Sequence, residues 1–214
     1  MRVLALETST SRGSVAVYGS GELLFHEQFN ADRSHSSTLF VALEKARATA
    51  DHFDRIAVGL GPGSYAGIRI SIAAALGINL ALGGELVGIP SVAALDITAS
   101  AYVVVGDARR GTFYFTAVDQ GQCLAGPLLA TEEEVRREVA SHQLPIFGTE
   151  PMAAFPSLVV ATPSAAILAR LAANDVGIVQ HGDLEPLYLR EPHITHPKNA
   201  PGLPAASAFA ASKL

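Results

Sequence analysis

The sequence has too few cysteines for a framework held together by disulfides or by cysteine-bound metal ions. Cys123 is its only cysteine, which excludes an intramolecular disulfide and a cysteine-based zinc site. Charged residues make up only 16% of the 214, and the net charge of −5 argues against a basic surface covering the whole molecule. The longest apolar stretch, Ile70 to Leu82, falls short of the ~20 residues that span a membrane. Without a signal-peptide pattern at the start, we expect a cytoplasmic protein with no membrane partner.

The hydrophobic pattern alternates between strands and helices, which is typical of an α/β protein. Short apolar runs predict strands at residues 3–6, 14–18, 22–29, 55–59 and 85–89. Helical spacing predicts one helix that ends near residue 50, a long helix at 64–82 and a short helix from 91 to about 99. Ser64 stands at the expected N-cap of the long helix, because its hydroxyl can accept a hydrogen bond from a first-turn amide.

The opening pattern recurs in the second half of the chain. The first strand ends at Glu7 and turns through Gly13, whereas a later apolar strand ends at Asp107 and turns through Gly111. In both halves a returning strand and a further glycine-containing turn follow, as in a β-meander. The repeat therefore predicts two α/β lobes with a cleft between them.

The lobe boundaries follow from changes in composition along the chain. The prolines that interrupt regular structure near the end are Pro192, Pro197, Pro201 and Pro204. We therefore expect an N-terminal lobe over residues 1–99, a smaller C-terminal lobe over 100–190 and a proline-rich tail over 191–214. A weak helix is expected in residues 205–214 of the tail.

Two polar loops are candidates for holding a phosphate group at the cleft. The first loop comprises Glu7, Thr8, Ser9, Thr10 and Ser11, with Asp107 and Gly111 of the other lobe facing it. The second loop, which leads into the long helix, comprises Gly61, Pro62, Gly63 and Ser64. Oriented backbone amides and a helix N-terminus bind anions, although no lysine follows as in a Walker loop. The alternative is that the hydroxyls satisfy turn amides and the glycines form a tight strand-to-helix turn.

The long helix at 64–82 is apolar nearly all round, and small residues recur along it at three- and four-residue spacing. Such a helix has to be covered on more than one side. One side would face its own sheet, and the other would face another protein, because a large apolar surface does not stay bare. The alternative is that the preceding helix covers it within the chain.

Other catalytic constellations are missing from the sequence. The seven histidines are scattered, and His193 and His196 lie in a proline-broken segment where a helical metal pair is not expected. No nucleophile elbow of a serine hydrolase is found either. These patterns favour neither a hydrolase nor a metalloenzyme.

Four motifs carry a resemblance to a known family. They are VLALETS at 3–9, RSHS at 33–36, GLGPGSYAGIRI at 59–70 and EPLYLR at 185–190. In this order and spacing they resemble the bacterial TsaB (YeaZ) family, from residue 1 to about 190. The resemblance implies the two-lobed fold of the actin-like ATPase (ASKHA) superfamily, in which each lobe has a mixed sheet with a β-meander, flanked by helices. It also implies a role in making threonylcarbamoyladenosine beside the anticodon of tRNAs that read codons starting with A.

Within that family, the resemblance implies a non-catalytic partner of the paralogue TsaD, with a TsaE-type ATPase and tRNA contacted through the complex. TsaD carries a metal-binding His-x-x-x-His segment, whereas residues 91–97 here read SVAALDI. Glu7 stands where many relatives have an aspartate that positions magnesium and water. We therefore expect no catalytic residue, no metal site and no intrinsic cofactor, with ATP or ADP held at most at a subunit interface.

Our main hypothesis is that the chain pairs with TsaD through its helices at 34–50 and 64–82, packed as a four-helix bundle. The residues expected at this interface are Arg33, His35, Leu39, Leu43, Tyr65, Ala66, Ile70, Ala73, Ala74 and Gly77, with Arg69 at its rim. A charge at Ala74 is expected to disrupt the contact. The alternatives are a homodimer through the same face, an autonomous ATP-dependent phosphotransferase or ATPase, and a peptidase that lacks an assembled triad.

Overall fold

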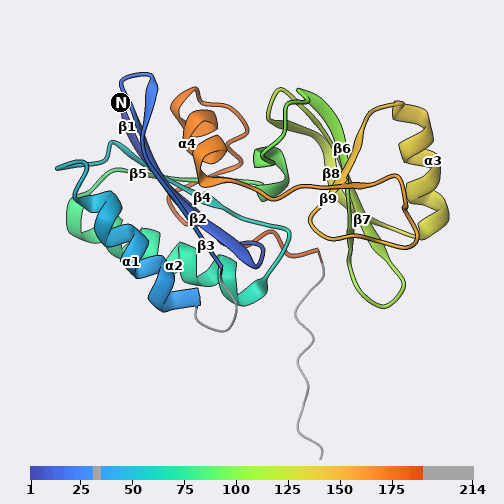
Figure 1. Cartoon of the computed structure of the whole chain (residues 1–214), viewed down its shortest axis with the longest axis horizontal. Coiled ribbons are helices and arrows are strands. Elements are labelled where there is room, and N and C mark those ends of the chain that lie inside the picture. The colour runs from blue at the N-terminus through green and yellow to red at the C-terminus, as the bar shows by residue number, and fades with distance from the viewer. Residues whose placement is uncertain (31–34, 190–214) are drawn as a thin grey trace, which may run out of the picture.

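The computed structural model describes residues 1–30 and 35–189, whose strands form two mixed sheets (Figure 1). The first sheet has the order β11-β5-β4-β1-β2-β3, and the second has the order β10-β9-β6-β7-β8. Strands of the first sheet are β1 (Arg2–Glu7), β2 (Arg12–Gly19), β3 (Glu22–Asn30), β4 (Arg55–Gly59), β5 (Glu85–Ile89) and β11 (Gln180–His181). Strands of the second sheet are β6 (Ala101–Asp107), β7 (Phe113–Asp119), β8 (Gln122–Ala130), β9 (Ile146–Gly148) and β10 (Val159–Val160).

Apart from β11, the two sheets have the same topology. In the first sheet, β1, β2 and β3 form an antiparallel meander, and β4 and β5 add to β1 in parallel. In the second sheet, β6, β7 and β8 form the meander, and β9 and β10 add to β6 in parallel. This correspondence confirms the repeat expected from the sequence and the α/β architecture of two lobes.

Helices cover both faces of the first sheet and one face of the second (Figure 1). Helices α1 (His35–Arg47) and α2 (Tyr65–Leu82) lie side by side on one face of the first sheet, and α4 (Ala165–Ala173) lies on the opposite face. Helix α3 (Glu132–His142) packs against the second sheet, where Val135 is buried with the β6 and β7 side chains. The central strands β1, β2, β4 and β5 are therefore buried on both sides, whereas the edge strands β3 and β11 are partly exposed.

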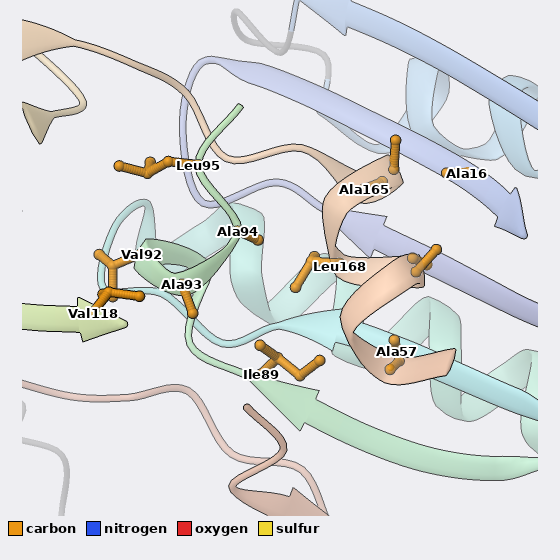
Figure 2. Packing of buried hydrophobic residues seen from close by; sticks show 14 of the residues in the cluster. Ala16, Ala57, Ile89, Val92, Ala93, Ala94, Leu95, Val118, Ala165 and Leu168 are labelled. Carbon is orange, nitrogen blue, oxygen red and sulfur yellow. The ribbon is translucent and has the colours of Figure 1, made fainter. Parts of the chain in front are cut away.

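The alternation of side chains along β1 divides the core of the first sheet into two layers. Leu4 and Leu6 point to the layer shared with α1 and α2, whereas Val3 and Ala5 point to the layer shared with α4. All four are at most 1% exposed. The α4 layer is built largely from small residues: Figure 2 shows Ala16, Ala57 and Ala165 together with larger residues such as Ile89 and Leu168. Small side chains on both sides let α4 lie close to the sheet.

The chain leaves the first lobe and returns to it. Arg55 of β4 binds Asp175, just after α4, through Nη1 and Oδ1 at 2.6 Å, and it also pairs with Glu85 of β5. Both α4 and β11 belong with the first sheet, although the sequence-based boundaries grouped them with residues 100–190. Those boundaries, as limits of independent units, stay a prediction, and the tail at 191–214 lies outside the described residues.

The predicted helix at 91–99 is much shorter than expected. Only Ser91–Ala94 form a 3-10 turn, and Leu95 is extended and bridges Pro163. The amide of Asp96 then donates to the carbonyl of Thr162 at 3.0 Å. The outgoing and returning connections between the lobes therefore pair with each other, which replaces the hydrogen bonds that a longer helix would have made.

Helix α2 is long and apolar enough to cross a membrane by length and composition alone, yet 28% of it is buried within the protein. Its buried residues are Gly67, Ile68, Ser71, Ala74 and Ala75. These residues form one stripe, which packs on the first sheet. α2 is therefore a surface helix of this lobe that leaves an apolar face uncovered in the described chain.

Candidate functional site

The loop before α2 is bound tightly to the turn after β1. Ser64 caps α2 by accepting a hydrogen bond from the Gly67 amide at 3.2 Å, as the sequence predicts, and its own amide donates to the Ser9 carbonyl at 2.7 Å. The Thr8 hydroxyl donates to the Gly67 carbonyl at 2.8 Å and lies 2.5 Å from the Ser71 hydroxyl. The start of α2 is thereby fixed relative to the centre of the first sheet.

Two glycines, Gly63 in this loop and Gly67 in the first turn of α2, allow the close approach. A Cβ atom on Gly63 would clash with the carbonyl of Ser9, and one on Gly67 would clash with the carbonyl of Thr8. Both obstacles are backbone atoms, which cannot swing aside as a flexible side chain can. The glycine-rich motif thus has a packing role whether or not an anion binds there.

The polar loops of the two lobes meet at a cleft of about 480 Å³. The residues that line it are Ser9, Thr10, Ser11, Pro62, Gly63, Ser64, Asp107, Ala108, Arg109, Tyr114, Thr149, Glu150 and Leu189. Most of the predicted phosphate contacts are thus brought together. Gly111 lines a neighbouring hollow of about 490 Å³, and Gly61 lies behind the cleft wall with a backbone φ of +89°.

Glu7 and Thr8, which the sequence placed among the phosphate contacts, do not line the cleft. Glu7 is completely buried, and its Oε1 accepts a hydrogen bond from the Ser9 amide at 2.6 Å. Its Oε2 has no hydrogen-bond partner among the described residues and lies so close to Gly59 that a Cβ there would clash with it. The carboxyl of Glu7 therefore lies in the core and not at the cleft surface.

Burial sets the charge state of Glu7. Loss of hydration raises the pKa of this carboxyl above its usual 4.5, and the neighbouring groups of Ser9 and Ser91 only partly oppose the shift. Glu7 is also turned away from the cleft, because it is completely buried and its Oε1 accepts a hydrogen bond from the Ser9 amide. Glu7 is therefore a structural group at the position where the resemblance implied a metal-positioning acid.

We expect Glu7→Gln to stabilise the protein at neutral and alkaline pH and to change little near about pH 4. Because the folded-state pKa of Glu7 is raised, the contribution of this residue to stability is most favourable below the ordinary carboxyl pKa and is lost as the pH rises through the raised value. Glutamine keeps the shape and does not titrate. Urea denaturation of both proteins across this pH range measures the difference, and parallel stability curves would contradict the raised pKa.

The cleft has mixed charge. Arg109 is tied to its own loop, since its amide donates to Asp107 Oδ1 at 2.7 Å and its Nη1 pairs with Asp107 Oδ2 at 3.1 Å. Arg109, Arg110 and Gly111 all have positive φ, which makes this a sharply turned loop. Within residues 1–30 and 35–189, no three His, Cys, Asp or Glu side chains are grouped to hold a metal ion. The cleft is thus a polar hollow lined by hydroxyl groups and by both acidic and basic side chains.

A larger apolar groove runs between α1 and α2, with a volume of about 760 Å³. Of the predicted interface residues, those that line it are Leu43, Ile70, Ala73, Ala74 and Gly77. Phe40 of α1 and Leu82 of α2 also line it, with Glu44 and Arg47 as the charged groups among its lining residues. This groove and the uncovered face of α2 are the most apolar surface features of the described lobe.

The predicted interface residues differ in burial. Leu39 is fully buried in the core of this chain, whereas Ala74, although only 7% exposed, lines the groove. Tyr65 and Ala66 are exposed near the start of α2. Arg33 and the side chain of His35 lie outside the described residues.

The sequence analysis missed the large apolar side chains that α1 and α2 expose. They are Phe40, Val41, Leu76 and Leu80, which are 47–79% exposed. In α1 a signal was present, because Phe40 and Val41 fall outside the buried stripe of Leu39, Leu43 and Ala46. In α2 no such signal exists, because the helix has apolar residues on all of its sides and the sequence does not show which side is exposed.

Comparison with known proteins identifies relatives of this chain. A profile of the family described as TsaD, tRNA N6-adenosine threonylcarbamoyltransferase, matches residues 29–142. An uncharacterized protein of Mycobacterium bovis is 31% identical over 197 residues, which cover 89% of this chain and 92% of the relative. The tRNA threonylcarbamoyladenosine biosynthesis protein TsaB of Haemophilus influenzae is 31% identical over 163 residues, covering 67% and 68%. An uncharacterized Mycobacterium leprae protein is 32% identical, and the match spans 40% of its length.

Solved structures agree with these relatives. A Pseudomonas aeruginosa protein described as similar to peptidase YEAZ superposes with a TM-score of 0.71 at 27% identity, covering 88% of this chain and 99% of that one. YeaZ from Pseudomonas aeruginosa superposes with a TM-score of 0.63 at 24% identity, which supports the fold. With the repeated sheet topology, these likenesses establish the actin-like ATPase (ASKHA) fold. The sequence relatives and the fold together show that this chain belongs to the TsaB (YeaZ) family.

Proposed function

We propose that this chain is the non-catalytic subunit of the complex that transfers a threonylcarbamoyl group to the adenosine beside the anticodon of tRNAs reading codons that begin with A. Its partner would be a TsaD-type transferase. The names of the relatives support the pathway, since TsaB of Haemophilus influenzae and of Escherichia coli are described as threonylcarbamoyladenosine biosynthesis proteins. The observation that carries the subunit role is the apolar groove between α1 and α2.

The groove supports pairing with another protein because of its size and composition. Around it, α1 and α2 expose Phe40, Val41 and Leu80, with Leu80 79% exposed. Contiguous apolar surface of this kind is typical of protein–protein interfaces. Helices of a partner would lie along α1 and α2, and Gly77 and Ala73, both exposed, would let one of them approach α2 closely.

The segment that corresponds to the metal-binding stretch of TsaD supports a non-catalytic role. Here Ser91–Ala94 form a buried turn, and the Ser91 hydroxyl accepts a hydrogen bond from the Gly61 amide at 3.0 Å. Ser91 therefore serves the packing of the loop before α2. Ser91 and the neighbouring Glu7 are both fully buried, so this segment makes packing contacts inside the lobe and does not line the cleft.

The further partners belong to the same proposal. A TsaE-type ATPase and tRNA would be contacted through the complex, in the cytoplasm, and ATP or ADP would be held at a subunit interface. Because this chain has a net charge of −5, its partners would make most of the contacts with the tRNA phosphates. A homodimer through the α1–α2 groove is the competing assembly, because one apolar face can serve both pairings.

The test is reconstitution with the TsaD-type protein of the same organism. We expect the two proteins to co-purify, and threonylcarbamoyl transfer to tRNA to require both together, since each lacks what the other supplies. Each protein alone, at the same total concentration, is the control. Transfer by this chain alone would contradict the non-catalytic role, and full transfer by the TsaD-type protein alone would contradict the subunit role.

A further inference from the structure

Helix α2 has a second flank, formed by a segment from the end of the described chain. Residues 182–189, which we call the C-terminal strap, run from β11 past α2. The amide of Gly182 donates to the Leu86 carbonyl at 3.0 Å, and the amide of Leu187 donates to the Leu60 carbonyl at 2.9 Å. Leu184 packs into the core layer beneath α2. The strap is therefore anchored to the first lobe at several points.

Between the strap and α2 lies an apolar hollow of about 420 Å³. Ile72 and Leu76 of α2 face Leu184 and Pro186 of the strap across it. Leu76 is 47% exposed, so the hollow opens to solvent. A bulky apolar side chain of another molecule would fit between these residues.

An arginine held by two tyrosines stands at one end of this hollow. Arg69 Nη1 donates to the Tyr188 hydroxyl at 3.1 Å and to the Tyr65 hydroxyl at 3.3 Å. The guanidinium carbon lies 5.2 Å from the centre of the Tyr65 ring, a cation–π distance, and the two rings are 5.7 Å apart. The cluster joins the start of α2 to the strap and holds Nη1 of the exposed arginine between the two hydroxyl groups.

The tyrosines leave most of the donors of Arg69 available. A guanidinium has five N–H donors, and the contacts to Tyr65 and Tyr188 use those of Nη1. The Nε–Nη2 edge has no hydrogen bond to the rest of residues 1–30 and 35–189, and no carboxylate there forms an ion pair with Arg69. This edge has the spacing to bind a carboxylate through two parallel hydrogen bonds.

We propose that Arg69, Tyr65 and Tyr188 form a docking site for an acidic segment of the protein that pairs with α2, in which a carboxylate binds the guanidinium and an adjacent apolar side chain enters the hollow between α2 and the strap. The site deepens the proposed function, on which it rests, because it names a feature of the TsaD-type partner. Tyrosine and arginine are the residue types that contribute most to protein interfaces. A guanidinium already held between two hydroxyl groups loses less entropy when it binds than a free one does.

Charge and position favour a protein over RNA as the occupant. Glu185 also lines the hollow, so the site pairs one cation with one anion, which suits a single carboxylate beside an apolar side chain better than a continuous run of phosphates. Ala73 lines both this hollow and the α1–α2 groove. A partner laid along α2 would therefore reach both surfaces at once.

The test is the affinity of single variants for the purified TsaD-type protein. We expect Arg69→Glu to weaken binding at least about tenfold, because it places like charges together, and Tyr188→Phe to weaken it less, because the arginine loses one of its two supports. Binding of the wild type should weaken with added salt, and that salt dependence should shrink in Arg69→Glu. The control is Arg137→Glu on α3, which makes the same charge change on the other lobe.

A groove variant, Phe40→Glu, separates the two proposals. Loss of binding by both Phe40→Glu and Arg69→Glu supports both. Loss by Phe40→Glu alone, with Arg69→Glu behaving like Arg137→Glu, overturns the docking site and leaves the proposed function in place. Loss by Arg69→Glu alone overturns the groove as the interface and supports the docking site.

Discussion

Replacing Gly67 with alanine is expected to destabilise the protein by about 3 kcal/mol or more. The new Cβ would clash with the carbonyl of Thr8, so the start of α2 would have to move away from the turn after β1. That movement would also strain the buried hydrogen bonds that Thr8 makes with Gly67 and Ser71, each of which costs about 1–3 kcal/mol when a partner is lost. For a chain of this size, the midpoint of thermal unfolding should fall by about 6–12 °C.

A second glycine of the same helix supplies the control. Gly77 is exposed on α2, and a Cβ atom there would meet nothing within 4 Å. We expect Gly77→Ala to stabilise the protein by about 0.5–1 kcal/mol, because alanine is the better helix former. If Gly67→Ala were as harmless as Gly77→Ala, the close contact between α2 and the turn after β1 would be refuted.

Phe40→Glu is expected to weaken pairing with a TsaD-type partner at least about 100-fold, or roughly 2.7 kcal/mol. Phe40 is 54% exposed and lines the α1–α2 groove, so the fold tolerates a change there while the interface does not. In the complex the glutamate would be buried among apolar groups, where an unpaired charge is strongly unfavourable. Titration of the partner, monitored by calorimetry, measures the loss.

Leu124→Glu is the matched control for this experiment. Leu124 of β8 is 66% exposed on the second sheet and contributes nothing to the groove. The Leu124→Glu substitution introduces the same charge as Phe40→Glu in place of an exposed apolar side chain. We expect this variant to bind the TsaD-type partner with wild-type affinity. Unfolding midpoints of both variants should stay near that of the wild type, which ensures that the loss for Phe40→Glu comes from the interface. Equal affinity of the two variants would refute the groove assignment.

The alternation of short apolar runs was enough to predict most strands and the repeat. The bounds of the strands depend on patterns of neighbouring residues. Ser64 marked the start of α2 for the same reason, because an N-cap bonds to an amide only a few residues away. The prediction of a helix at 91–99 was wrong, because a contact between residues distant in sequence ends the helical turn, and a local sequence pattern does not reveal such a contact. Leu95 pairs with Pro163, which is distant in sequence, and this pairing ends the helical turn.

The candidate site was harder to predict because side-chain direction decides it. Ser9, Thr10 and Ser11 do line the cleft, whereas Glu7, only two residues earlier, is fully buried. In the same way, Leu39 is buried and Phe40 is exposed on adjacent positions of α1. Composition marked both segments as candidates, but only the packed structure shows which of the neighbouring residues reach the surface.

The paired connections between the lobes have a consequence for the architecture. All strands of the second sheet lie between residues 101 and 160, within a chain whose first lobe resumes at α4. The amide of Ser164 donates to the Ala94 carbonyl at 2.9 Å, so the two ends of this stretch lie next to each other. The second lobe is thus an insertion into the first, and a turn of a few residues would suffice to close the gap it leaves. A shortened chain without the second lobe would then still contain the face that carries α1, α2 and the strap.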